Sequence, residues 1–114
     1  MAFIDLDLAA PGPAISDIGY AAWAWCLSSG DKRGSAAEQA RQLRLFADGY
    51  GLEARERLVG AIVERQTWSA RWWRERGKAT VGPSPERVEE IIAWNLTERA
   101  YVKANRILFL DALS

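Results

Sequence analysis

The sequence predicts a mainly α-helical domain of about four helices behind one short N-terminal strand. Apolar residues recur at helical spacing over most of the chain after residue 15, and serine and glycine residues stand where helices would begin and end. The chain has 114 residues, enough for one domain and too few for two. We therefore assign residues 1–114 to a single helical domain, with a strand and a Pro/Gly loop over 1–14 and the helical part over 15–114.

The predicted strand covers residues 2–8, where the pattern has a period of two. Asp5 and Asp7 share one side with an aromatic ring, and the other side carries Ile4, Leu6 and Leu8. The sequence Ala-Pro-Gly-Pro at 10–13 then predicts a loop, because proline cannot donate to a strand ladder and glycine permits sharp turns.

The first helix is expected to open at Ser16 or Asp17 and to run to Leu27, with Ser16 as its N-cap. Residues 18–27 are apolar on nearly all sides, which predicts a helix that is buried on most of its surface. The only cysteine, Cys26, lies in this run, and the chain has no histidine. This composition excludes an intrachain disulfide and a Cys/His zinc site, and it predicts a buried, packed cysteine.

Serine-led patterns mark the next helices. Residues 35–38, Ser-Ala-Ala-Glu, match a capping box, and glycines at 49 and 51 predict the end of that helix. A third helix is expected from about Leu52 to Arg76, with an inward face formed by Leu58, Ala61, Ile62 and Trp72.

The fourth helix is predicted to begin with Ser84 as N-cap and Pro85 at its first position, and to reach Leu113. Several polar residues fall among its apolar positions: Asn95, Glu98, Arg99 and Asn105. Polar groups at such positions need hydrogen-bond partners, so a buried network is favoured there over a binding site.

Charge and hydropathy restrict the class of partner. Fifteen basic residues balance fifteen acidic residues, so no overall field attracts nucleic acid or an anionic membrane. No apolar run approaches the roughly 20 residues of a membrane span, and the acidic residues Asp5 and Asp7 interrupt any secretory signal. We expect a cytoplasmic protein with no nucleic-acid and no membrane partner.

Asp5 and Asp7 are the candidate metal ligands. Two residues apart on a strand, their carboxylates project to one face, where repulsion between them is relieved by a bound cation. Mg²⁺ sites use one or two carboxylates together with phosphate and water. The simpler alternative is a strand whose polar face is only solvated.

The segment Phe3-Ile4-Asp5-Leu6-Asp7, with the Pro/Gly loop and Asp17 after it, resembles the metal motif of the aminoglycoside phosphotransferase and choline kinase family. The resemblance implies a protein-kinase-like fold in which Asp5 holds Mg²⁺ against ATP, with Asp7 at a further acidic position. It also implies that Asp17 supports the active-site loops structurally. The helical remainder would be the C-terminal subdomain that builds part of the acceptor-substrate pocket.

The sequence departs from this family where the chemistry is performed. It carries no His-Gly-Asp-x-x-x-x-Asn catalytic loop and no nucleotide lobe with a phosphate-binding lysine, so it is expected to begin after them. Phosphoryl transfer depends on several groups acting together, and we expect a phosphotransferase fragment that is inactive alone. Its partner would be a second copy in a homodimer or a missing N-terminal lobe. The alternative is a stand-alone helical protein-interaction module, again a homodimer.

Residues 68–76 combine tryptophan with arginine and suggest a surface of functional interest. Three interpretations are open: core packing with a basic rim, a substrate or protein interface, and a nucleic-acid or membrane surface. The candidate acceptor-side or interface residues are Trp68, Trp72, Trp73, Glu98 and Arg99.

Overall fold

The computed structural model describes residues 12–76 and 82–114, and within these ranges it is entirely helical. The α-helices are α1 (Gly12–Cys26), α2 (Ala36–Tyr50), α3 (Leu58–Arg76), α4 (Pro85–Ala104) and α5 (Arg106–Leu113). Two short 3₁₀ turns, η1 (Asp31–Arg33) and η2 (Arg55–Arg57), precede α2 and α3. The predicted strand, with Asp5 and Asp7, lies outside the described residues.

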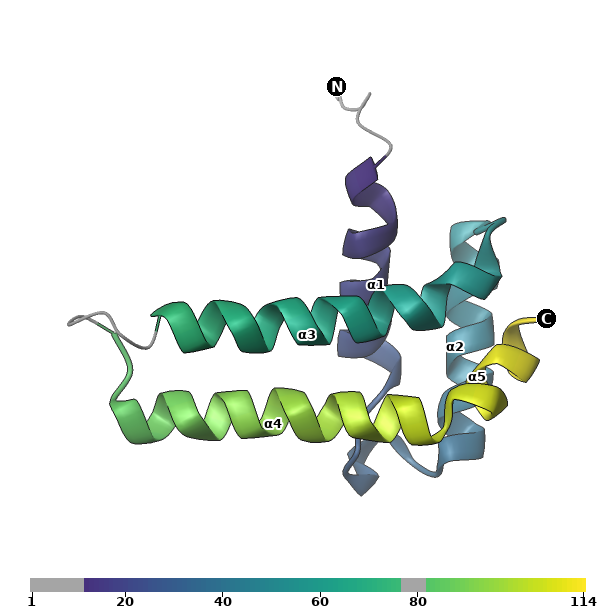
Figure 1. The fold of residues 1–114 in the computed structure, drawn as a ribbon. Coiled ribbons are helices and arrows are strands. Elements are labelled where there is room, and N and C mark those ends of the chain that lie inside the picture. Colours follow the sequence, from purple (N-terminus) through teal and green to yellow (C-terminus); the bar gives the residue numbers. More distant parts are fainter. Residues whose placement is uncertain (1–11, 77–81) are drawn as a thin grey trace.

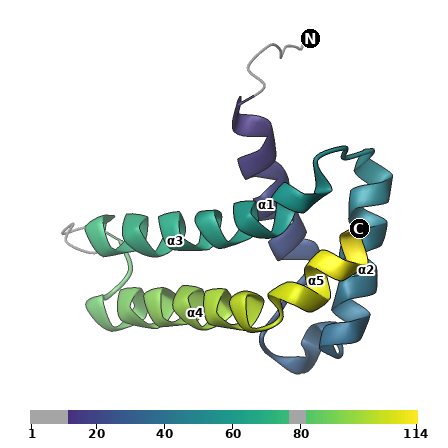
Figure 2. The same ribbon diagram turned by 45° about the vertical axis from the view of Figure 1, so that its right-hand side comes forward.

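Helices α3 and α4 lie side by side as a long hairpin, and α1 crosses this hairpin against α3 (Figure 1). Helix α2 stands at the end of the hairpin where α4 passes into α5, and α5 packs across α2 (Figure 2). The resulting body is flat, with extents of 43 × 38 × 19 Å. Of the helices that the structure describes, none combines the length and the apolar character needed to cross a membrane.

The predicted caps of α2 and α4 are confirmed. The Ser35 hydroxyl accepts from the Glu38 N–H while the Glu38 carboxylate accepts from the Ser35 N–H, which completes the capping box. Gly51 ends α2 in the left-handed conformation at φ 66°. Ser84 caps α4 through the Arg87 N–H, with proline in the first turn.

The predicted start of α1 was wrong. The helix begins at Gly12, so residues 12–14 are helical rather than part of a loop, and Ser16 and Asp17 lie inside the helix. The physical reason is that proline is tolerated in the first turn of a helix, where its missing N–H has no intrahelical acceptor in any case. The sequence pattern predicts that Asp17 opens the helix, but Asp17 lies in the second turn of α1.

The prediction of about four helices was also too low, because the last segment is interrupted at Asn105. The backbone of Asn105 is not α-helical (φ −106°, ψ 18°), and the side-chain amide of Asn105 donates to the Tyr101 carbonyl at 2.9 Å. A side chain that bonds the backbone in this way competes with the helical ladder. The chain turns there, which lets α5 pack on α2 instead of continuing along the hairpin. Helix α3 likewise begins at Leu58, later than the predicted Leu52.

A contiguous apolar core joins α1, α2, α3 and α5 with the C-terminal part of α4. Its fully covered side chains include Leu43, Leu58, Ile62, Val102 and Phe109. Where α1 crosses α3 the backbones approach closely: a Cβ at Gly19 would lie 3.1–3.2 Å from atoms of Ala61. The absence of a side chain at Gly19 thus sets the distance between α1 and the hairpin.

Helix α3 confirms Leu58, Ala61 and Ile62 as inward residues, but the prediction for Trp72 was wrong. Trp72 is 38% exposed, whereas the other three are buried. Its ring instead contacts aromatic neighbours on its own helix, Trp68 and Trp73. The helical spacing of tryptophan residues on α3 therefore does not by itself show which face of the helix is buried.

Candidate functional site

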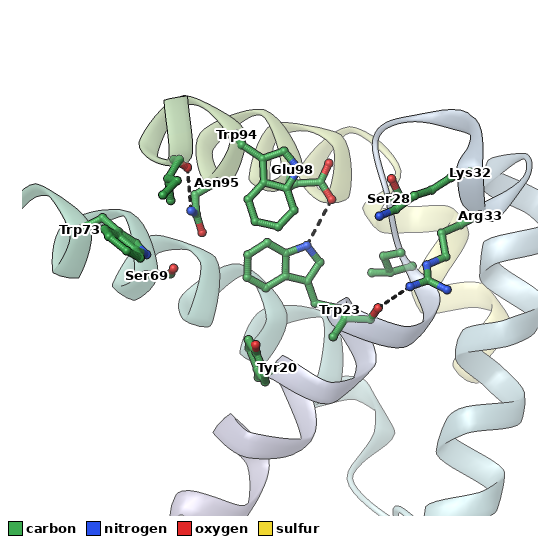
Figure 3. Close-up of a pocket in the computed structure, with 13 residues that line it drawn as sticks. Tyr20, Trp23, Ser28, Lys32, Arg33, Ser69, Trp73, Trp94, Asn95 and Glu98 are labelled. Atoms are coloured by element: carbon green, nitrogen blue, oxygen red, sulfur yellow. Dashed lines mark hydrogen bonds between the residues drawn. The ribbon is translucent and has the colours of Figure 1, made fainter. Parts of the chain in front are cut away.

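A cavity of about 370 Å³ lies between α1, the α3–α4 hairpin and the segment that follows α1 (Figure 3). Helix α1 contributes Tyr20 and Trp23, α3 contributes Ser69 and Trp73, and the segment after α1 contributes Lys32 and Arg33. Helix α4 contributes Ile91, Trp94, Asn95 and Glu98. Ring, amide and charged groups from three helices thus converge on one space.

Aromatic rings form much of its wall. Trp23 and Trp94 are stacked, with ring centroids 5.2 Å apart and planes inclined by 21°, and Tyr20 meets Trp23 edge to face at 6.3 Å. Trp23 is buried, but Trp94 keeps 53% of its surface exposed. Stacking on α1 therefore holds Trp94 in place while much of its surface stays open to a ligand.

Glu98 is a buried carboxylate that accepts three hydrogen bonds. It is 2% exposed, and it accepts hydrogen bonds from the Trp23 indole N–H at 3.2 Å, the Ser29 N–H at 2.9 Å and the Ser29 hydroxyl. A buried charge requires such compensation. The predicted buried network is confirmed here: it ties α4 to α1 and to the segment after α1.

Asn95 is buried as well, but only half of its amide is used. Its NH₂ group donates to the Ile91 carbonyl at 2.8 Å, whereas its Oδ1 has no hydrogen-bond partner among the described residues. Asn95 is 1% exposed and lines the cavity. A buried acceptor left unpaired is unfavourable by about 1–3 kcal/mol, so this oxygen is a point where a ligand donor would be favoured.

Two cationic side chains lie on the side of the cavity formed by the segment after α1. Arg33 donates through Nη2 to the Ala24 carbonyl at 2.7 Å, which satisfies an acceptor near the end of α1. Lys32 is exposed. The whole segment is anchored by buried Gln39, whose side chain bonds the Ser28 N–H and the carbonyls of Ser28 and Gly34.

The structure divides the residues singled out from the sequence. Trp73 and Glu98 line the cavity. Trp68 and Trp72 do not. They belong to a partly exposed series of rings and guanidinium groups, here called the α3 aromatic series: Tyr20, Arg65, Trp68, Trp72 and Arg76. The Arg65 guanidinium lies 4.8 Å from the Tyr20 ring centroid and 5.0 Å from that of Trp68. Arg99 donates to the Thr67 hydroxyl at 3.1 Å and joins α4 to α3.

Asp17 is exposed on α1, with an Oδ1 3.8 Å from Arg65 Nη1. Within residues 12–76 and 82–114, no three carboxylate or thiol groups gather into a set that could hold a metal ion. The predicted metal ligands Asp5 and Asp7 lie outside those ranges, and their role stays a prediction.

Cys26 behaves as a packed apolar side chain, as predicted. It is 5% exposed, and its burial raises the pKa of the thiol to about 11, an effect that the nearby Arg33 charge only partly opposes. A thiol with this pKa stays protonated at neutral pH and is a poor nucleophile.

The sequence did not identify Tyr20, Trp23, Trp94 and Asn95 as members of one site. One signal was available: Ile91, Asn95 and Glu98 follow the i, i+4, i+7 spacing of a single helix face, which places two polar groups in an apolar stripe. The contribution of α1 carries no such signal, because Trp23 and Glu98 are 75 residues apart.

Comparisons with protein families, with curated proteins and with solved structures found no match to this chain.

Proposed function

We propose that this chain is a small-molecule-binding helical domain, equivalent to the acceptor-side part of an aminoglycoside-phosphotransferase-like kinase, and that it does not transfer phosphate alone. The observation that carries the proposal is the cavity between α1 and the α3–α4 hairpin. Its volume of about 370 Å³ falls within the roughly 300–1,000 Å³ typical of ligand sites, and apolar rings with a few fixed polar groups line it.

The order of the elements supports the link to this family. In the resemblance described above, the metal motif is followed directly by helices that build the acceptor pocket. Here α1, the first helix after that motif, supplies Tyr20 and Trp23 to the cavity, and the last long helix supplies Trp94 and Glu98. The domain would therefore contribute binding, while phosphate and metal chemistry would require Asp5, Asp7 and groups from another chain or lobe.

Ligand-detected NMR with a mixed set of small amines, neutral aromatic compounds and acids tests the binding proposal. We expect members of the set to bind the wild-type protein and to bind Trp94→Ala at least tenfold more weakly, because Trp94 forms an open wall of the cavity. Trp25→Ala is the matched control, since Trp25 is 72% exposed and does not line this cavity. Binding to none of the set, or binding unaffected by Trp94→Ala, would refute the proposal.

A titration with Mg²⁺ and ATP followed by amide NMR tests the kinase-like part separately. We expect saturable shifts at Asp5 and Asp7 that require metal and nucleotide together, with no release of ADP in the presence of hydroxyl or amino acceptors. No shift at millimolar concentrations would remove the link to the metal motif and leave the cavity proposal intact.

A second candidate function, a homodimeric interaction module, is favoured by apolar side chains on the outer faces. Trp25 is 72% exposed and Leu45 61% exposed, and together with Phe46 they border a shallow hollow between α1 and α2. Exposed aromatic and aliphatic groups at such a hollow are typical of protein contacts. Sedimentation velocity at high micromolar concentration tests this candidate: a dimer that Leu45→Lys dissociates supports it, and a clean monomer excludes it.

A further inference from the structure

We infer that the cavity binds a small planar acid: a flat ring system with an N–H or O–H donor at one end and a carboxylate at the other. The inference rests on the proposed function, because it names the ligand class of the same cavity. Three features of the described residues lead to it: an unpaired buried acceptor, a wall of open rings, and two cations on the side away from that acceptor.

The acceptor is Asn95 Oδ1. Its orientation is fixed, because the other half of the amide donates to the Ile91 carbonyl at 2.8 Å, and exchanging the two ends would remove that bond. The oxygen is buried and has no donor among the described residues. A ligand that presents N–H or O–H at this point replaces an unsatisfied acceptor with a hydrogen bond, and a ligand without one does not.

The rings select a flat, apolar body. Trp94, stacked on Trp23, and Trp73 on the neighbouring helix line the same cavity as the Asn95 amide (Figure 3). Trp94 is half exposed, so part of its surface is available to a bound ring. Aromatic pairs prefer offset or edge-to-face contact, and both geometries already occur in this wall.

The charges select an acid over an amine. The cavity is lined by two cations, Lys32 and Arg33, and by one carboxylate, Glu98. The Glu98 carboxylate is already compensated by the Trp23 indole and by two donors from Ser29. Arg33 has five N–H donors, and one of them binds the Ala24 carbonyl, so its charge and that of exposed Lys32 face a ligand with less compensation.

The acceptor and the cations lie at different ends of the cavity. Asn95 and Glu98 are three residues apart on α4, about 4.5 Å along the axis, and Ser29 binds at the Glu98 end. In the view of Figure 3, Asn95 and Trp73 lie on one side of the Trp23–Trp94 pair, and Lys32 and Arg33 lie on the other. A ligand that spans the rings would thus have a hydrogen-bond acceptor, Asn95 Oδ1, at one end and the positive charges of Lys32 and Arg33 at the other.

The test compares three probes by titration calorimetry. Indole-3-acetate carries the ring, the N–H donor and the carboxylate; 1-methylindole-3-acetate lacks the donor; tryptamine has an ammonium group in place of the acid. We expect indole-3-acetate to bind most tightly. The loss of one hydrogen bond should weaken the methylated probe about three- to tenfold, and tryptamine should bind more weakly than the acid.

Two variants assign the ends of the ligand. In Asn95→Leu the acceptor is absent, so indole-3-acetate and its methylated form should bind equally; a remaining difference would show that the methyl group acts by steric exclusion and would overturn the donor contact. The melting temperature should not fall, because the substitution removes an unsatisfied buried oxygen. Lys32→Glu should weaken the binding of indole-3-acetate but not that of tryptamine. Lys103 is exposed and lies outside the cavity, so Lys103→Glu should leave the binding of both probes unchanged.

The outcomes separate this inference from the proposal on which it rests. Tighter binding of tryptamine, or equal binding of acid and amine, would overturn the ligand class but would leave a cavity that binds small molecules. Failure of all three probes, while other members of the mixed set bind at Trp94, would also overturn only the ligand class. Failure of the entire set would overturn both.

Discussion

The two ends of the molecule are held together by different kinds of burial. Where α2 meets α5, the buried side chains are almost all apolar, with Leu43, Ala47 and Phe109 fully covered. Where α1 meets the α3–α4 hairpin, buried polar groups stand among the rings: Gln66, Asn95 and Glu98 are each at most 2% exposed.

The difference indicates that apolar packing stabilises the α2–α5 end, and it agrees with the ligand binding that we propose for the cavity end. Apolar contact at the α2–α5 end stabilises the fold without any requirement for partners. At the cavity end, Asn95 Oδ1 has no hydrogen-bond partner among the described residues and the Trp94 ring is half exposed. These groups therefore contribute less to the free energy of unfolding than an apolar core of the same volume would. Such groups are typical of sites where a ligand completes the packing.

The largest expected effect is at the apolar end. Phe109→Ala removes a fully buried ring that contacts Tyr101 and the α2 core, and it should lower the free energy of unfolding by about 3–5 kcal/mol. Urea denaturation measures this loss. Ile107→Ala, at a side chain that is 74% exposed, is the control and should change stability by less than about 0.5 kcal/mol. Similar losses for both variants would contradict the assignment of the core.

A smaller effect is expected from the polar network at the cavity end. Glu98→Ala leaves the buried Trp23 indole N–H without an acceptor and removes the acceptor of the Ser29 N–H, which should lower the free energy of unfolding by about 1–3 kcal/mol. Glu98→Gln retains one acceptor oxygen and should lose less. Equal losses in the two variants would show that the side chain stabilises the fold by packing and not by its hydrogen bonds.

The smallest expected effect concerns the start of α2, outside both regions. Ser35→Ala removes the cap and should lower the free energy of unfolding by about 1 kcal/mol. The hydrogen bond from the Ser35 N–H, and to a smaller extent that from the Ser35 hydroxyl, holds the pKa of Glu38 below its ordinary value of 4.5.

A depressed folded-state pKa gives a contribution that is present above pH 4.5 and lost as the pH falls through the folded-state value. The stability difference between wild type and Glu38→Gln should therefore disappear in acid. A difference that persists there would show that the carboxylate charge is not what stabilises the cap.

Local features of the fold could be predicted because their causes lie within a few residues of one another. The capping box of Ser35 and Glu38, the left-handed glycine at 51 and the Ser84-Pro85 start are each complete within one helical turn, and each is confirmed. The start of α1 was missed because a proline fits both a loop and a first turn, and the sequence does not decide between them.

By itself, the sequence determined that the described residues form capped helices, that Cys26 is buried and that Asn95 and Glu98 belong to a buried face. Only the tertiary structure decided that α1 crosses α3 at Gly19, that Asn105 separates α4 from α5, and that Trp23 stacks on Trp94. The physical reason is distance along the chain. Capping and periodicity act between near neighbours, whereas the cavity depends on side chains from separate helices whose contact no local pattern encodes.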